Sequence, residues 1–168
     1  MRELVIGATG FIGQALCQQL PEAARTARRV GPYEAYLDLA DFRDNNLPAC
    51  DIAYVCAGAN GAKACEGNQE SFRVNVDAPI EIARVVAARG GFTVWISSMS
   101  VEWLGGAYQR QKLAAECALR PLHTVGIVRA GRVTRDNVAD LCRTLVEVGR
   151  NRISGVTRWG TDDIAYVK

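Results

Sequence analysis

Glu3-Leu4-Val5-Ile6-Gly7-Ala8-Thr9-Gly10-Phe11-Ile12-Gly13 decides how the rest of this chain is interpreted. Leu4–Ile6 is a short apolar run typical of a fully buried strand, and residues 14–20 carry the pattern of a helix. Between them lie three glycines spaced three residues apart. A strand, a glycine-rich turn and a helix in this order predict the first half of a dinucleotide-binding site.

Each glycine of the turn has a separate expected role. Gly7 lets the chain turn tightly off the strand, Gly10 leaves room for a pyrophosphate against the backbone, and Gly13 lets the helix pack close to the strand. The phosphates would meet unpaired N–H groups at the helix N-terminus. The order is G-x-x-G-x-x-G rather than G-x-G-x-x-G, so a structural glycine turn in another strand–helix unit is the alternative interpretation.

Composition places the chain among globular proteins of one domain. Its 168 residues are 49% apolar, and we expect a single domain over residues 1–168. The net charge of +2 gives no reason to expect a nucleic-acid partner. No apolar run reaches membrane-spanning length and no signal-peptide pattern follows Met1, so we expect a cytoplasmic protein that does not bind a membrane. Six cysteines without a C-x-x-C pair and one histidine, His123, predict free thiols and no metal site.

Strand and helix patterns alternate along the whole chain. This alternation predicts an α/β fold of the Rossmann type, a doubly wound parallel sheet with little or no substrate domain. Further strands are expected at residues 23–30, 36–39, 52–56, 93–96, 124–128 and 153–159. Further helices are expected at residues 71–89, with a kink at Pro79, and at 108–119 and 138–148, with a short helix or turn at 41–47.

The region after the second strand bears on the choice of cofactor. An acidic residue that would hold the ribose diol of NAD is missing between Glu22 and Glu34, whereas Arg25, Arg28 and Arg29 lie there. Guanidinium groups at this point suit a 2′-phosphate, which favours NADP. Solvated surface arginines are the alternative interpretation, and NAD stays possible.

The chemistry-bearing residues follow the strand expected at residues 93–96. Tyr108 and Lys112 are four residues apart and would share one helix face. A nearby ammonium would lower the pKa of the phenol, so that Tyr108 could exchange a proton with a substrate oxygen, and Lys112 could also bind the nicotinamide ribose. Ser98, at the carboxyl end of the strand, could hydrogen-bond the reacting oxygen. For Ser97, Ser98 and Ser100, turn and capping chemistry is the ordinary alternative.

Taken together, the motifs resemble the short-chain dehydrogenases/reductases, most closely the extended branch of NAD-dependent epimerases and dehydratases. The matching segments are Gly7–Gly13, Asp38-Leu39, Ala57-Gly58, Val74-Asn75-Val76, Ser97-Ser98, Tyr108-x-x-x-Lys112 and Glu116. The stretch from Cys65-Glu66 through Asn75 to Ala83 is similar to dTDP-4-dehydrorhamnose reductases. The resemblance spans about residues 1–133.

The resemblance implies a set of site residues. Ser98, Tyr108 and Lys112 would form the catalytic triad, and Asn75 would support a proton-relay water. Asp38 and Leu39 would flank the adenine. Together with the glycine loop and the arginines described above, the predicted cofactor contacts are Gly7, Thr9, Gly10, Phe11, Ile12, Gly13, Arg28, Arg29, Asp38, Leu39, Cys56, Ala57, Gly58, Tyr108 and Lys112.

Three departures from the family pattern keep two functions open. Tyr108 follows Ser98 by only ten positions, Ala130 stands where proline is usual, and only residues 134–168 follow Val133, where extended members build a substrate domain. The leading interpretation is a small NADP-dependent oxidoreductase acting on a carbonyl or hydroxyl carbon, possibly of a nucleotide sugar. The alternative is a non-catalytic NAD(P)-binding regulator or partner subunit. The resemblance also implies a homodimer.

Overall fold

A seven-stranded parallel sheet forms the centre of the computed structural model, which describes residues 1–29, 31, 34–103 and 105–160. All neighbouring strands run parallel. Their order across the sheet is β3 (Ala35–Tyr36), β2 (Ala24–Ala27), β1 (Glu3–Ile6), β4 (Ile52–Val55), β5 (Phe92–Ser98), β6 (Val125–Ala130) and β7 (Gly155–Trp159). The predicted doubly wound Rossmann fold is confirmed.

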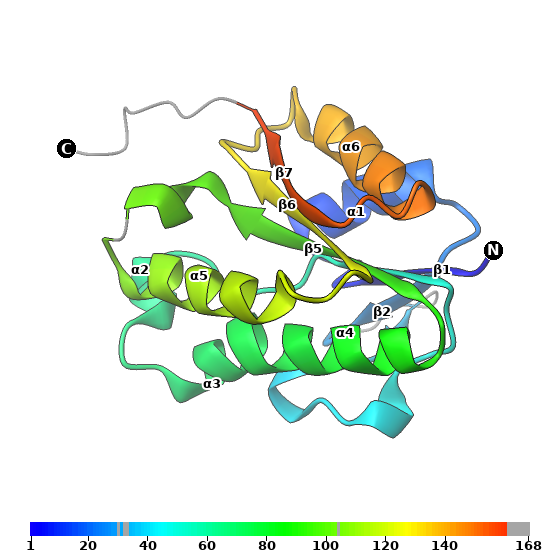
Figure 1. The fold of residues 1–168 in the computed structure, drawn as a ribbon, viewed down its shortest axis with the longest axis horizontal. Coiled ribbons are helices and arrows are strands. Elements are labelled where there is room, and N and C mark those ends of the chain that lie inside the picture. The colour runs from blue at the N-terminus through cyan, green and yellow to red at the C-terminus, as the bar shows by residue number, and fades with distance from the viewer. Residues whose placement is uncertain (30, 32–33, 104, 161–168) are drawn as a thin grey trace.

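Helices cover both faces of the sheet (Figure 1). One face carries α1 (Phe11–Gln19) and α6 (Val138–Arg150), and the other carries α4 (Ala78–Ala88) and α5 (Ala107–Leu119). Strand β1 shows why two cores form. Because successive side chains of a strand point to opposite faces, Val5 packs under α1 and α6 while Leu4 and Ile6 pack under α4 and α5.

Most elements agree with the sequence predictions, and the third strand is the main difference. It was expected over residues 36–39, but it ends at Tyr36. The carboxylate of Asp38 accepts a hydrogen bond from the Ala40 N–H and starts a 3-10 turn, Leu39–Asp41, which competes with strand pairing. The end of the expected second strand at Val30 and the expected turn residue Pro32 lie outside the described residues.

The expected helix at residues 71–89 is a composite. It begins as α3 (Gln69–Phe72), passes through a π-helical turn, Arg73–Asp77, and continues as α4. Pro79 lies in the first turn of α4 and has no N–H to donate to the carbonyl four residues back. The missing hydrogen bond therefore falls next to the π-helical turn, where the helical hydrogen-bond pattern already changes. The short helix α2 (Ala62–Cys65) was not predicted.

Strands β1 and β4 are neighbours in the middle of the sheet. From β1 the chain adds β2 and β3 on one side, and from β4 it adds β5, β6 and β7 on the other. In doubly wound sheets a crevice opens at this point, beyond the carboxyl ends of the strands. The residues that follow β1, β2, β3 and β4 therefore converge there. In the described part of the chain, no helix is both long and apolar enough to cross a membrane.

Candidate functional site

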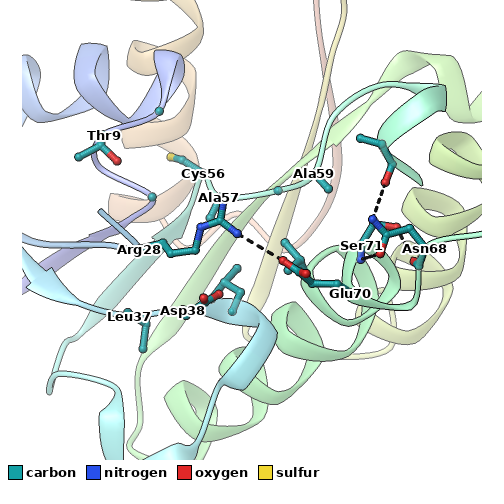
Figure 2. Close-up of a pocket in the computed structure, with 16 residues that line it drawn as sticks. Thr9, Arg28, Leu37, Asp38, Cys56, Ala57, Ala59, Asn68, Glu70 and Ser71 are labelled. Carbon is teal, nitrogen blue, oxygen red and sulfur yellow. Dashed lines mark hydrogen bonds and ion pairs between the residues drawn. The ribbon is translucent and has the colours of Figure 1, made fainter. Parts of the chain in front are cut away.

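A groove of about 460 Å³ opens beyond the carboxyl ends of the central strands (Figure 2). One wall comes from the loops that follow β1 to β4, and the opposite wall comes from α2, α3 and the turn after them. Its lining residues are Gly7, Thr9, Gly10, Arg28, Leu37, Asp38, Leu39, Cys56, Ala57, Gly58, Ala59, Ala64, Asn68, Glu70, Ser71 and Val74. The position at the switch point is where this fold class binds its ligands.

The glycine loop is shaped by contacts that exclude any side chain. Gly7 has a φ of 85°, and a Cβ there would lie 2.7 Å from the Ala57 nitrogen. A Cβ on Gly13 would lie 2.1 Å from the Gly7 carbonyl oxygen. Helix α1 starts after Gly10 without any side-chain cap, so its first N–H groups are left for a ligand. Backbone donors at the positive end of a helix dipole suit a pyrophosphate.

The groove brings together most of the predicted cofactor contacts. Those that line it are Gly7, Thr9, Gly10, Arg28, Asp38, Leu39, Cys56, Ala57 and Gly58. Those in the described part of the chain that do not line it are Phe11, Ile12, Gly13, Arg29, Tyr108 and Lys112. Arg28 reaches across to α3, where its Nη1 lies 3.3 Å from Glu70 Oε1 (Figure 2).

Asn75 holds the inner end of the groove in shape. Its Oδ1 accepts from the Ala59 N–H at 2.9 Å, and its Nδ2 donates to the Ala59 carbonyl at 2.9 Å and to Gln111 Oε1 at 2.8 Å. Both hydrogens of the amide are thus engaged by protein atoms. A Cβ on Gly58 would approach Asn75 Oδ1 to 3.2 Å and Lys112 Nζ to 3.6 Å, so Gly58 joins the groove to the predicted catalytic residues.

Tyr108 lies in the first turn of α5, and Ser98 is the last residue of β5. A hydrogen bond from Ser98 favours the ionised form of the Tyr108 phenol. Ser98 Oγ also accepts from the Ser100 N–H at 3.2 Å and lies 2.8 Å from Ser100 Oγ. Burial is the larger effect and, together with the nearby Cys65, raises the pKa of Tyr108 above its ordinary value. The sequence argument for a pKa lowered by Lys112 is therefore not supported.

Lys112 explains why that argument fails. Its Nζ donates to the Ile96 carbonyl at 2.9 Å and lies 5.9 Å from the centre of the Tyr108 ring, so the two groups share a helix face without direct pairing. Burial lowers the pKa of Lys112 to about 8, although Cys65, Glu116 and Cys56 act in the opposite direction. A lysine pKa lowered by burial beside a groove is typical of functional sites.

A buried ionic network lies further along α5 from Tyr108 and Lys112 and is centred on Glu116. Glu116 is fully buried and accepts from Arg129 Nη2 at 2.7 Å, from Arg120 Nη2 at 2.9 Å and from Ser97 Oγ at 2.5 Å. Arg129 Nη1 also donates to Glu102 Oε1 at 2.7 Å. Burial raises the pKa of Glu116, but the hydrogen bonds together outweigh it and hold this pKa below its ordinary value. The network ties α5 to β5, β6 and the turn after β5.

Three polar residues of the site were not predicted. Gln111 is buried and donates through Nε2 to Ser71 Oγ at 2.9 Å, which links α5 to α3. Cys65 is buried beside Asn75, with Sγ 3.5 Å from Nδ2. Glu70 faces Arg28 across the groove. Gln111 alone had a sequence signal, since it lies between Tyr108 and Lys112 on the same helix.

The family described as NAD dependent epimerase/dehydratase matches residues 3–125. No curated protein matches the chain significantly. A hypothetical dTDP-4-dehydrorhamnose reductase from Sulfolobus tokodaii is similar in structure, with a TM-score of 0.76, 19% identity, and coverage of 94% of this chain and 76% of that one.

Two further solved structures have similar folds. The dTDP-4-dehydrorhamnose reductase from Bacillus anthracis, in complex with NADP, has a TM-score of 0.73 at 18% identity, and the match covers 95% of this chain and 74% of that one. The short chain dehydrogenase from Shigella flexneri has a TM-score of 0.71 at 17% identity, over 93% of this chain and 89% of that one. The match thus covers a larger share of the Shigella flexneri protein than of the two reductases.

Proposed function

Because the chain belongs to the NAD-dependent epimerase/dehydratase family, we propose that it is an NADP-dependent oxidoreductase that interconverts a carbonyl and a hydroxyl group, with Tyr108 as the acid/base. The observation that carries the proposal is the position of Lys112 Nζ, which lies 5.9 Å from the centre of the Tyr108 ring and 3.6 Å from where a Cβ on Gly58 would lie, at the inner end of the groove. When bound, the nicotinamide cofactor would supply or accept the hydride.

The chain's own residues would then divide the work. The loop around Gly7 and Gly10 would hold the pyrophosphate, and Asp38 and Leu39 would flank the adenine. Ser98 would hydrogen-bond the reacting oxygen, and Tyr108 would give that oxygen a proton or take one from it.

The proposed substrate is a small molecule with a ketone, and a nucleotide sugar is the first class to test. Two of the structural neighbours are described as dTDP-4-dehydrorhamnose reductases, although their low identity to this chain carries only the fold. The proposed cofactor is NADP, because Arg28 lines the groove directly after β2. Consumption of NADPH with a panel of nucleotide 4-ketosugars and simple ketones would identify the class.

Replacing Tyr108 with phenylalanine tests the proposed chemistry. Tyr108→Phe removes one oxygen at the Ser98 contact, so we expect turnover to fall by about 10²–10⁴-fold while NADP affinity is retained. Tyr36→Phe is the matched control, because this tyrosine is 63% exposed on the edge strand β3. Unchanged turnover in Tyr108→Phe with a genuine substrate would remove the catalytic assignment.

A non-catalytic regulator is the second candidate function. The raised pKa of Tyr108 and the complete use of the Asn75 amide hydrogens by protein atoms favour it. This candidate predicts NADPH binding without turnover across the whole panel, and Tyr108→Phe would then change neither affinity nor any other response.

The proposed assembly is a homodimer formed through α4 and α5. These helices lie side by side on one face of the sheet (Figure 1), and α5 exposes Ala114, Cys117 and Ala118. Small side chains allow two helix pairs to approach closely. Light scattering should give the mass of two chains, and Ala114→Arg should reduce it to one. A single-chain mass for the unmodified protein at micromolar concentration would contradict the proposal.

A further inference from the structure

The ammonium of Lys112 lies over the face of an indole. Its Nζ is 4.5 Å from the centre of the Trp95 ring, within the range of a cation–π interaction. Trp95 belongs to β5, one residue before Ile96, whose carbonyl accepts the hydrogen bond from Lys112. The carbonyl acceptor and the nearer aromatic face are thus supplied by the same strand, and the Tyr108 ring lies further away, at 5.9 Å.

The surroundings of Lys112 offer little else to a positive charge. Within the described residues no carboxylate forms an ion pair with it, because Glu116, one turn further along α5, is engaged by Arg129 and Arg120. The other titratable groups that act on the ammonium are Cys65 of α2, Glu116 of α5 and Cys56 after β4, and the Tyr108 ring faces it from α5. The lysine itself is only 6% exposed. A buried ammonium with one acceptor is costly to keep charged.

Core packing alone does not account for a tryptophan at this position. Trp95 is 1% exposed, and its Nε1 has no hydrogen-bond partner among the described residues. Leaving a buried N–H unpaired is unfavourable, and phenylalanine or leucine would fill the apolar core without this cost. Tryptophan, however, has the aromatic face that attracts a cation most strongly.

We infer that Trp95 is a positioning residue for Lys112, whose ammonium it holds charged and directed toward Gly58 at the inner end of the groove. The missing side chain of Gly58 leaves the ammonium open on that side, since a Cβ there would lie 3.6 Å from Nζ. The inference rests on the proposed function only in assigning the ribose of a nicotinamide cofactor as the group that Lys112 meets. The contact between Trp95 and Lys112 does not depend on that assignment.

Nuclear magnetic resonance can test the contact without any substrate. The chain has three lysines, Lys63, Lys112 and Lys168, so selective lysine labelling gives three sets of side-chain signals. Lys112→Met identifies the Lys112 set by its disappearance. We expect the ε-methylene protons of Lys112 in the unmodified protein to be shifted upfield by the ring current of Trp95. Ordinary shifts for all three lysines would overturn the inference, even if no variant folds.

Two substitutions measure what the indole contributes. In Trp95→Leu we expect the upfield shift to vanish and the titration midpoint of Lys112 to fall by about one pH unit, because the buried ammonium loses its aromatic face. Trp95→Phe keeps a weaker face, so its midpoint should lie between those of the other two proteins. Equal midpoints in all three proteins would contradict the inference.

Calorimetric titration with NADP separates this inference from the proposed function. Trp95→Leu should weaken NADP binding about 3–10-fold, and the same change in a Lys112→Met background should have little further effect. If the lysine signals respond as expected but NADP does not bind the unmodified protein, the cofactor assignment fails and the positioning role stands. Equal weakening by Trp95→Leu in both backgrounds would mean that Trp95 acts through general packing and would overturn the positioning role.

Discussion

At the end of the groove next to α1, the walls are made of main chain. Gly7 and Gly13 exclude any Cβ, and the first N–H groups of α1 have no side-chain cap. Behind the other end, next to α5, the supporting groups are buried side chains: Asn75 and Gln111 are hydrogen-bonded to each other, and Lys112 donates to the Ile96 carbonyl. The first end is therefore specified by local sequence, whereas the second exists only when distant segments have packed together.

The main-chain end should be the less tolerant of any added atom. In Gly13→Val the Cβ would lie 2.1 Å from the Gly7 carbonyl oxygen, and neither backbone segment can move away. We expect a loss of more than about 5 kcal/mol, comparable to the whole stability of a small domain, and no cooperative unfolding transition. Gly105→Val is the control, because nothing lies within 4 Å of a Cβ there. A cooperative melt for Gly13→Val would show that the loop is adaptable.

The side-chain end should be sensitive to the removal of a charge partner. Arg129→Met leaves the fully buried Glu116 without its main donor, and we expect about 3–5 kcal/mol of stability to be lost at pH 7 in urea unfolding. Arg120→Met removes another donor to the same carboxylate. The Arg120 side chain is 45% exposed, so we expect a loss of less than about 1 kcal/mol of stability.

The pH dependence of that difference follows from the pKa of Glu116. Hydrogen bonds hold this pKa below the ordinary value of 4.5, so the stabilisation is present above about pH 4.5 and is lost as the pH falls through the folded-state pKa. The gap between the unmodified protein and Arg129→Met should therefore narrow below pH 4.5. A gap that stays constant down to pH 2 would place the effect in packing.

The sequence predicted the glycine-loop end of the site better than the end next to α5. The glycine loop was predictable because strand, turn and helix signals are local, and nine of the predicted contacts, named above, line the groove. Asp38 ended β3 early through a hydrogen bond to Ala40, a local competition that strand propensity does not reveal. The pKa of Tyr108 was predicted with the wrong sign, because spacing along a helix does not report burial. Cys65 and Glu70 had no local signal, because only packing brings Cys65 beside Asn75 and Glu70 opposite Arg28.

The burial of the Lys112 ammonium should lower the stability of the fold. Burial lowers its pKa from 10.5 to about 8, so folding disfavours the charged form. Below pH 8 both states are protonated and the whole cost applies; between pH 8 and 10.5 the unfolded state binds more protons, and stability rises with pH.

Lys112→Met should therefore stabilise the protein by at most about 3 kcal/mol at pH 7, with a smaller gain by pH 10. Lys63→Met, at an exposed lysine of α2, should change stability little at either pH. Thermal unfolding of the three proteins at pH 7 and pH 10 measures the gain. Destabilisation by Lys112→Met at pH 7 would mean that its contacts with Ile96 and Trp95 outweigh the burial of its charge.

The smallest expected effect is a change in cofactor affinity at the mouth of the groove, which is lined by exposed side chains. Arg28 and Glu70 are each more than half exposed, so their ion pair at 3.3 Å contributes little to stability but occupies the guanidinium that a 2′-phosphate would need. Arg28→Ala should weaken NADP binding about 10-fold and NAD binding far less, because only NADP carries the additional phosphate.

Glu70→Gln should have the opposite sign. It removes the carboxylate that competes for Arg28, so we expect NADP affinity to rise about 3-fold at low salt and by less at high salt, with NAD affinity unchanged. Arg29→Ala is the matched control, since Arg29 is exposed and does not line the groove. Calorimetric titrations with both cofactors at two salt concentrations give all of these values. Equal losses for NAD and NADP in Arg28→Ala would mean that the arginine supports the loop rather than reading the phosphate, and the preference for NADP would then have no basis in this part of the groove.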